Sequence, residues 1–120
     1  MIINKKFFKN KIGYVDNRYL GFKSNSKGHY VYINKINNDN TCNVNTIKSL
    51  EDRDGNFKYN KLNHVKNGYV YPIPVNDSNF KLWSGVNLTT IKNVDIDKIK
   101  NVGCKSFKKR HIFLIGKSKK

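Results

Sequence analysis

Residues 29–50, HYVYINKINNDNTCNVNTIKSL, decide the fold that we predict for this chain. The segment 29–33 is β-branched and aromatic, as strands are, and residues 41–50 alternate between apolar and polar side chains. Between them, the Asn- and Asp-rich segment 37–40 is a strong turn signal. We therefore predict a β-hairpin. Its expected core-facing residues are Val31, Ile33, Val44 and Ile47.

Further short elements are expected along the rest of the chain. The segments predicted as strands are 13–15, 57–63, 68–73 and 86–94, with a turn at 53–56, a helical turn at 78–83 and a short helix or loop at 95–100. Residues 1–11 fit neither a helical nor a strand period. Pro72 and Pro74 should end their strand or place it at a sheet edge.

The basic stretch 105–116, KSFKKRHIFLIG, is expected to supply the last strand. Its apolar run 112–115 predicts a strand buried on both faces. The cationic and titratable side chains directly before this run would then be held at the edge of the core. These residues are Lys105, Lys108, Lys109, Arg110 and His111.

Together these elements predict a mainly β fold. Six or seven short strands with one or two short helical turns favour a small closed barrel, because closure removes unpaired strand edges. We expect residues 1–116 to form this single basic domain and residues 117–120 to form a basic tail.

The charge of the chain favours a polyanionic partner. Its formal net charge is +16, from 24 Lys and Arg against 8 Asp and Glu, which exceeds what solubility requires. Residues 17–38 and 98–120 contain no carboxylate, so we expect these two regions to line the same positive face.

Several features favour a cytoplasmic protein. The sequence has no apolar run long enough for a membrane-spanning helix, and its first residues lack the features of a signal peptide. Cys42 and Cys104 are the two cysteines, and they are expected to be thiols, with a disulfide between them as the alternative. No cofactor and no metal site are expected.

The candidate functional residues suit RNA cleavage without a metal. That reaction requires a base for the ribose 2′-hydroxyl, an acid for the leaving 5′-oxygen, and cations for the phosphorane. His29 and His111 are the candidates for proton transfer, and Arg110 and Lys23 would hold the phosphate. The expected substrate-binding residues are Ser24, Ser26, Tyr30, Arg18, Lys105, Lys108 and Lys109. Each histidine also has a simpler interpretation as a surface or strand-edge residue.

The segment 71–103, YPIPVNDSNFKLWSGVNLTTIKNVDIDKIKNVG, is similar to the C-terminal half of the MazF/PemK-type toxin endoribonucleases. The similarity lies in the pattern at 90–95, the short segment 97–99 and the glycine that follows. This resemblance implies an SH3-like barrel, cleavage of single-stranded RNA without a metal, and neutralisation by an acidic antitoxin. Gly28 and His29 stand where those toxins carry an Arg-Pro pair, and the predicted final strand stands where they tend to end in a helix.

Two functions are therefore predicted. The first is a toxin-like, metal-independent endoribonuclease that is neutralised by an acidic protein antitoxin or by an RNA antitoxin. The alternative is a non-catalytic RNA- or ribosome-binding barrel that uses the same basic face. The oligomeric state is left open, a homodimer included.

Overall fold

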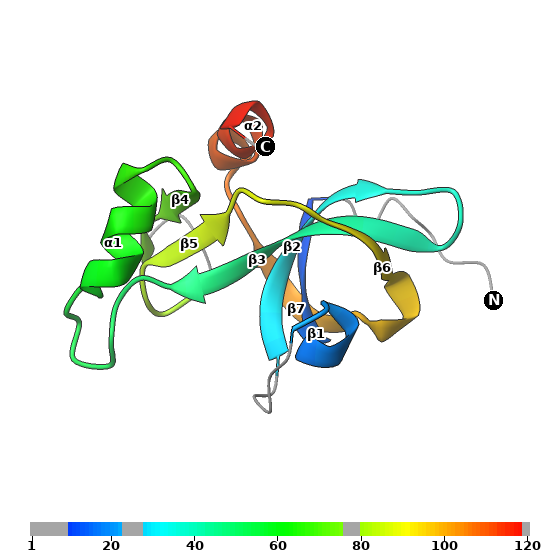
Figure 1. Cartoon of the computed structure of the whole chain (residues 1–120), viewed down its shortest axis with the longest axis horizontal. Helices are drawn as coiled ribbons and strands as arrows, with labels where there is room; N and C mark the ends of the chain where they lie inside the picture. Colours follow the sequence, from blue (N-terminus) through cyan, green and yellow to red (C-terminus); the bar gives the residue numbers. More distant parts are fainter. Residues whose placement is uncertain (1–9, 23–27, 76–79, 119–120) are drawn as a thin grey trace.

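A single antiparallel sheet dominates the fold (Figure 1). The computed structural model describes residues 10–22, 28–75 and 80–118, with the backbone alone at 101, 103–106 and 118. Within these residues the strands pair in the order β4-β5-β3-β2-β1-β7, and β6 also pairs with β3. The strands are β1 (Lys11–Asp16), β2 (Gly28–Ile36), β3 (Thr41–Ser49), β4 (Val70–Ile73), β5 (Ser84–Asn87), β6 (Ile91–Asp95) and β7 (Lys100–Ser106). The prediction of a mainly β fold is confirmed.

The predicted hairpin is present as β2 and β3, which pair from Tyr30↔Ile47 to Ile36↔Cys42. β3 is the central strand, because its other edge pairs with β6 near its start and with β5 near its end. Figure 1 shows β5 and β6 following each other along β3. The pairings within the described residues leave β4 and β7 as the two ends of this sheet.

The predicted strand at 86–94 is wrong, because it is broken into β5 and β6. The break coincides with a buried side chain of the central strand. Asn45 is fully buried, and its Nδ2 donates to the carbonyl oxygen of Asn87 at 3.0 Å and to Thr90 Oγ1 at 3.4 Å. A side chain therefore supplies a hydrogen bond where the strand ladder stops.

Both faces of the central hairpin are buried. On one side lies the first core, which consists of Ile12, Tyr32, Ile47, Ile73, Val86, Leu88, Phe107 and Ile115. On the other side lies the second core, which consists of Val15, Leu20, Val31, Ile33, Cys42, Val44, Val94 and Ile96. Along β2, Tyr32 enters the first core while its neighbours Val31 and Ile33 enter the second, as strand alternation requires. The four predicted core-facing residues of the hairpin are all buried.

The predicted strand at 57–63 is wrong, because helix α1 (Tyr59–Lys66) occupies most of it. The helix ends in a Schellman motif, in which Gly68 has a positive φ of 79°. The Gly68 N–H donates to the Val65 carbonyl at 3.0 Å, and the Tyr69 N–H donates to the His64 carbonyl at 2.9 Å. Aromatic residues at the start of the segment suggested a strand, but the glycine at its end marks a helix terminus.

The predicted final strand at 112–115 is also wrong, because helix α2 (Lys109–Ser118) contains these residues. Ile115 is fully buried, whereas Phe113 is 62% and Leu114 is 42% exposed. A four-residue apolar run does not distinguish a strand from a helix, and here only the residues at helical spacing face the core. Lys117 and Ser118 belong to this helix, not to a separate tail.

The remaining short elements agree in part with the predictions. The 3-10 turn η4 (Ile96–Lys98) lies within the segment 95–100 that is predicted as a short helix or loop, and a second turn, η2 (Asn17–Tyr19), follows β1. Residues 80–82 form bends and not the predicted helical turn, whose start lies outside the described residues. β4, which contains Pro72, lies at the sheet edge as predicted. Of the described helices, none has the length and apolar character needed to cross a membrane.

Candidate functional site

His29 is held at the start of β2 by a buried asparagine. Its Nδ1 lies 2.6 Å from Oδ1 of Asn17, which belongs to η2 and is 1% exposed. An amide oxygen can only accept, so Nδ1 carries the proton and Nε2 holds the lone pair. The ring of Phe22 packs against the imidazole with 5.3 Å between centroids. The tautomer and the orientation of His29 are therefore both set by the fold.

The surroundings of His29 disfavour its charged form. Partial burial lowers the pKa of His29, and the ammonium group of Lys61 lowers this pKa further. Both effects keep the imidazole neutral near pH 7. A neutral ring with its lone pair on Nε2 can accept a proton, which is the property required of a general base.

Lys48 and His64 form a hydrogen-bonded pair on the same side of the sheet as His29. Tyr30 pairs with Ile47 in the antiparallel hairpin, so the preceding residue His29 is opposite the following residue Lys48. Residues opposite each other in a strand pair point to the same face of the sheet. Lys48 Nζ lies 3.0 Å from His64 Nδ1. A lysine ammonium only donates, so His64 Nδ1 accepts and its Nε2 carries the proton. Partial burial lowers the pKa of Lys48, and the positive charge of Lys61 lowers it further.

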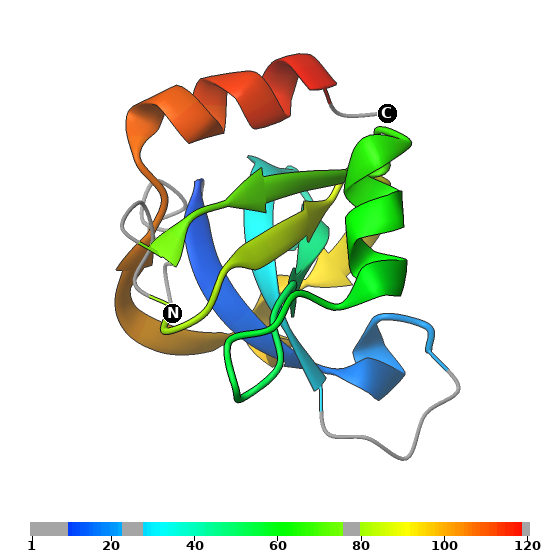
Figure 2. The same cartoon turned by 90° about the vertical axis from the view of Figure 1, so that its left-hand side faces the viewer.

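These side chains form a basic cluster, which we define as His29, Lys48, Lys61 and His64. Lys61 and His64 are three residues apart on α1, so they lie on the same face of this helix. Lys61 is close enough to lower the pKa values of both His29 and Lys48. In Figure 2, α1 and η2 both lie to the right of the strands, and α2 crosses above them. Mutual repulsion among these cations is relieved when an anion binds.

The predicted pairing of His29 with His111 is wrong. His111 lies in α2, is 8% exposed, and has its Nδ1 2.8 Å from the hydroxyl oxygen of Tyr71. Tyr71 packs against the first core, whereas His29 shares the strand face of Val31, which lies in the second core. The two imidazoles therefore lie on opposite faces of β2. The reason is the helical conformation of α2, which turns His111 inward together with the core-facing residues.

The other predicted residues in the C-terminal region do not join the basic cluster. Lys108, Lys109 and Arg110 are exposed at the start of α2. Lys105 lies in β7, and its side chain is outside the described part of the structure. Lys108, Lys109 and Arg110 provide a basic surface on the side of the molecule that carries α2, separate from His29.

The predicted residues near the N-terminal strand are placed in part. Arg18 is exposed in η2, with its guanidinium 3.7 Å from the Asp16 carboxylate and 4.9 Å from the centroid of the Tyr19 ring. Lys98 Nζ lies 5.3 Å from the same ring, so the two carboxylate-free regions meet at Tyr19. Residues Lys23, Ser24 and Ser26 lie outside the described residues.

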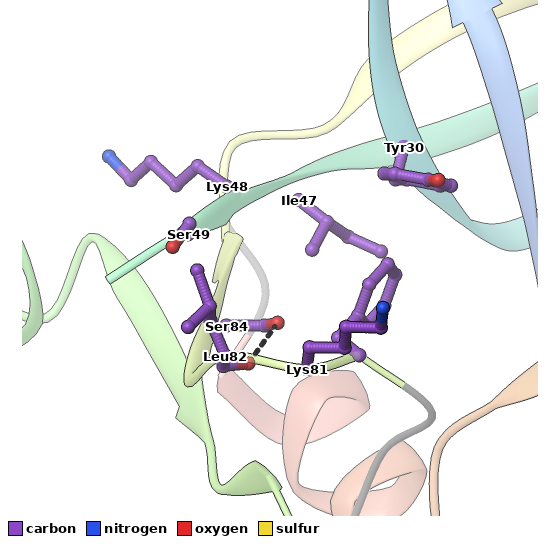
Figure 3. A pocket seen from close by; sticks show the side chains of 8 residues that line it. Tyr30, Ile47, Lys48, Ser49, Lys81, Leu82 and Ser84 are labelled. Carbon is purple, nitrogen blue, oxygen red and sulfur yellow. Dashed lines mark hydrogen bonds between the residues drawn. The ribbon is translucent and has the colours of Figure 1, made fainter. Parts of the chain in front are cut away.

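Tyr30 is the predicted substrate-binding residue that lines a cavity. Its ring packs edge-to-face against Tyr14 and Phe80, with centroid distances of 5.3 Å and 5.0 Å. Lys48 is also among the lining residues, but its ammonium group is directed away from Tyr30 (Figure 3), because Tyr30 and Ile47 lie on the opposite strand face from His29 and Lys48.

Lys48, Lys61, His64 and the supporting Asn17 are not among the site residues predicted from the sequence. Gly68 and the three-residue spacing of Lys61 and His64 were signals for a helix with a basic face. Lys48 had no local signal, because its role depends on strand pairing. No three His, Cys, Asp or Glu side chains gather at one place in the described part of the chain.

No family model, curated protein or solved structure matches this chain. The resemblance to the MazF/PemK-type toxins therefore stays a prediction.

Proposed function

We propose that this protein is a toxin-like endoribonuclease that cleaves single-stranded RNA without a metal ion. The proposal rests on His29 of the basic cluster, whose Nδ1 lies 2.6 Å from Asn17 Oδ1 and whose pKa is lowered by burial and by Lys61. RNA cleavage through the 2′-hydroxyl needs a neutral base next to positive charge. His29 can act as this base, and Lys48 and Lys61 supply the positive charge.

The basic cluster supplies a group for each step of this reaction. His29 Nε2 accepts the proton of the ribose 2′-hydroxyl while the 2′-oxygen attacks phosphorus. The bond from phosphorus to the 5′-oxygen then breaks, and the leaving oxygen takes a proton from the Lys48–His64 pair. Lys61 stabilises the negative charge that develops on the phosphorane. The products are a 2′,3′-cyclic phosphate and a free 5′-hydroxyl.

Other features of the chain support the toxin-like part of the proposal. Residues 109–118 form helix α2, where MazF/PemK-type toxins also tend to have a helix. The chain departs from those toxins at Gly28 and His29, which stand where they carry an Arg-Pro pair. The net charge of +16 suits RNA as substrate and an acidic protein, or an RNA, as antitoxin. Such an enzyme would act in the cytoplasm.

The test is cleavage of a single-stranded RNA in excess EDTA, with detection of the 2′,3′-cyclic phosphate. We expect His29→Gln to lower the rate by about 100-fold or more, as expected for loss of a general base. Lys61→Gln should lower the rate by a smaller factor. The matched control is Lys109→Gln, which removes an exposed positive charge on α2 and should change the rate less than threefold. Wild-type activity in His29→Gln would refute the assignment of the base.

A non-catalytic RNA-binding protein is the second candidate, favoured by the exposed basic surface on α2. That surface combines Lys108, Lys109 and Arg110 with the exposed Phe113, and Lys117 Nζ lies 5.0 Å from the Phe113 ring centroid. This candidate predicts no turnover, together with RNA binding that weakens steeply as salt rises. Binding would then fall by graded amounts when the exposed cations are neutralised one at a time.

A further inference from the structure

Two exposed aromatic side chains lie in and directly after η2, the turn that supports His29. Tyr19 is 37% exposed and Phe22 is 40% exposed. The Phe22 ring packs against the His29 imidazole, with 5.3 Å between centroids and 59° between the ring planes. In Figure 2, η2 lies below α1 on the same side of the strands. An exposed apolar ring is therefore in direct contact with the candidate general base.

The fold holds the Phe22 ring in place while leaving it exposed. The carbonyl oxygen of Asn17 accepts hydrogen bonds from the Leu20 N–H at 3.0 Å and the Phe22 N–H at 3.2 Å. Leu20 anchors this turn in the second core, and Gly21 reverses the chain with a positive φ of 81°. The side chain of the same Asn17 contacts His29. One buried residue therefore fixes both the imidazole and the backbone that carries Phe22.

We propose that Phe22 stacks an unpaired base of the RNA beside the 2′-hydroxyl that His29 deprotonates, and that Arg18 and Lys98 bind a neighbouring phosphate. The inference rests on the proposed function, since it identifies how the same site holds its substrate. Single-stranded RNA presents unstacked bases, and aromatic side chains are the groups on which these bases stack. Because every base has a π face, this contact should accept any base.

The cations for the neighbouring phosphate are held around the Tyr19 ring. The Arg18 guanidinium lies 4.9 Å from its centroid and Lys98 Nζ lies 5.3 Å from it. The Arg18 side chain also contacts the Asp16 carboxylate at 3.7 Å, which helps to orient the guanidinium. Tyr19 and Phe22 are three residues apart, so their Cα atoms are less than about 11 Å apart. A strand with one base on Phe22 can therefore place a nearby phosphate at these cations.

The test is binding of a short fluorescent single strand of 2′-deoxynucleotides, which has bases and phosphates but no 2′-hydroxyl and cannot be cleaved. Its affinity is compared with that of the same strand with abasic nucleotides. We expect Phe22→Leu to weaken binding of the intact strand by about tenfold, as loss of one stacking partner does. The same variant should change binding of the abasic strand less than about twofold. A purely structural role of Phe22 would not make its effect depend on the bases.

Two further variants control for the aromatic ring. Phe22→Tyr keeps the ring and should change neither affinity by more than about twofold. The matched control is Phe57→Leu, because Phe57 is 44% exposed and also packs against one ring, that of Trp83, with 5.6 Å between centroids. It should have less than about a twofold effect on either strand. Thermal unfolding of each variant checks that it is folded.

A charge variant tests the phosphate contact independently of stacking. Lys98→Gln should weaken binding of the intact and abasic strands by the same factor. It should also reduce the slope of log affinity against log salt by about 0.7, as expected for one phosphate contact on a single strand. The matched control is Lys92→Gln, which removes an exposed charge on β6 and should leave the slope unchanged.

Equal affinities of the intact and abasic strands for the wild-type protein would overturn the base site, as would an effect of Phe22→Leu that is the same on both strands. An unchanged salt slope in Lys98→Gln would overturn the phosphate contact.

The outcomes of the binding and cleavage experiments are separable. Cleavage of unmodified RNA combined with no effect of Phe22→Leu on binding would remove the base site and leave the proposed enzyme. Base-dependent binding that is lost in Phe22→Leu, without any cleavage, would establish the base site in a non-catalytic RNA-binding protein.

Discussion

Alanine substitution at Ile115 tests the helical conformation of the C-terminal segment, on which the separation of His111 from His29 depends. Ile115 is fully buried in the first core. Replacing a fully buried isoleucine by alanine costs about 2–5 kcal/mol of unfolding free energy. For a domain of this size the loss corresponds to a fall in Tm of roughly 10 °C or more.

The isomeric neighbour Leu114 provides the matched control. It is 42% exposed, so Leu114→Ala removes only part of a buried side chain and should cost about 1 kcal/mol. Phe113, which is 62% exposed, should be less sensitive still, at under about 1 kcal/mol. The assay is guanidinium unfolding followed by circular dichroism at 25 °C, with equal m-values for all variants. In a strand buried on both faces, all three substitutions would be costly. Equal losses at Ile115 and Leu114 would therefore refute the helix.

Three other predictions follow from local contacts. Burial and Lys61 hold the pKa of His29 below its ordinary value of 6.5, so the unfolded chain binds this proton more readily than the folded protein. The unfolding free energy should therefore fall as the pH drops below about 6.5, and guanidinium titrations at pH 7.5 and 5.5 should show a smaller fall in His29→Gln. Gly28→Ala should destabilise the fold by about 1–3 kcal/mol in the same assay, because its Cβ would meet a backbone carbonyl of β1 that cannot move aside; an unchanged midpoint would contradict this packing. Cys42 is a free thiol in the second core, and burial raises its pKa to about 12. In a Cys104→Ser background it should resist Ellman's reagent until the protein is unfolded, and rapid reaction of the folded protein would show that it is accessible.

The amino-acid sequence was sufficient for the elements whose signal is local. The hairpin at 29–50 has strand residues on both sides of an Asn-rich turn, and its expected core residues are buried. The edge position of β4 was one of the two outcomes predicted from its prolines, because Pro72 cannot donate a ladder hydrogen bond. The excess of positive charge is likewise a property of composition, independent of the fold.

Tertiary structure decided which of these side chains meet. The apolar run 112–115 fits a strand or a helix equally well, and only the packing of Ile115 in the first core selects the helix. That choice places His111 against Tyr71, away from His29. The basic cluster depends on the pairing of β2 with β3 and on the position of α1. Its side chains are distant in sequence, so no local pattern could have grouped them.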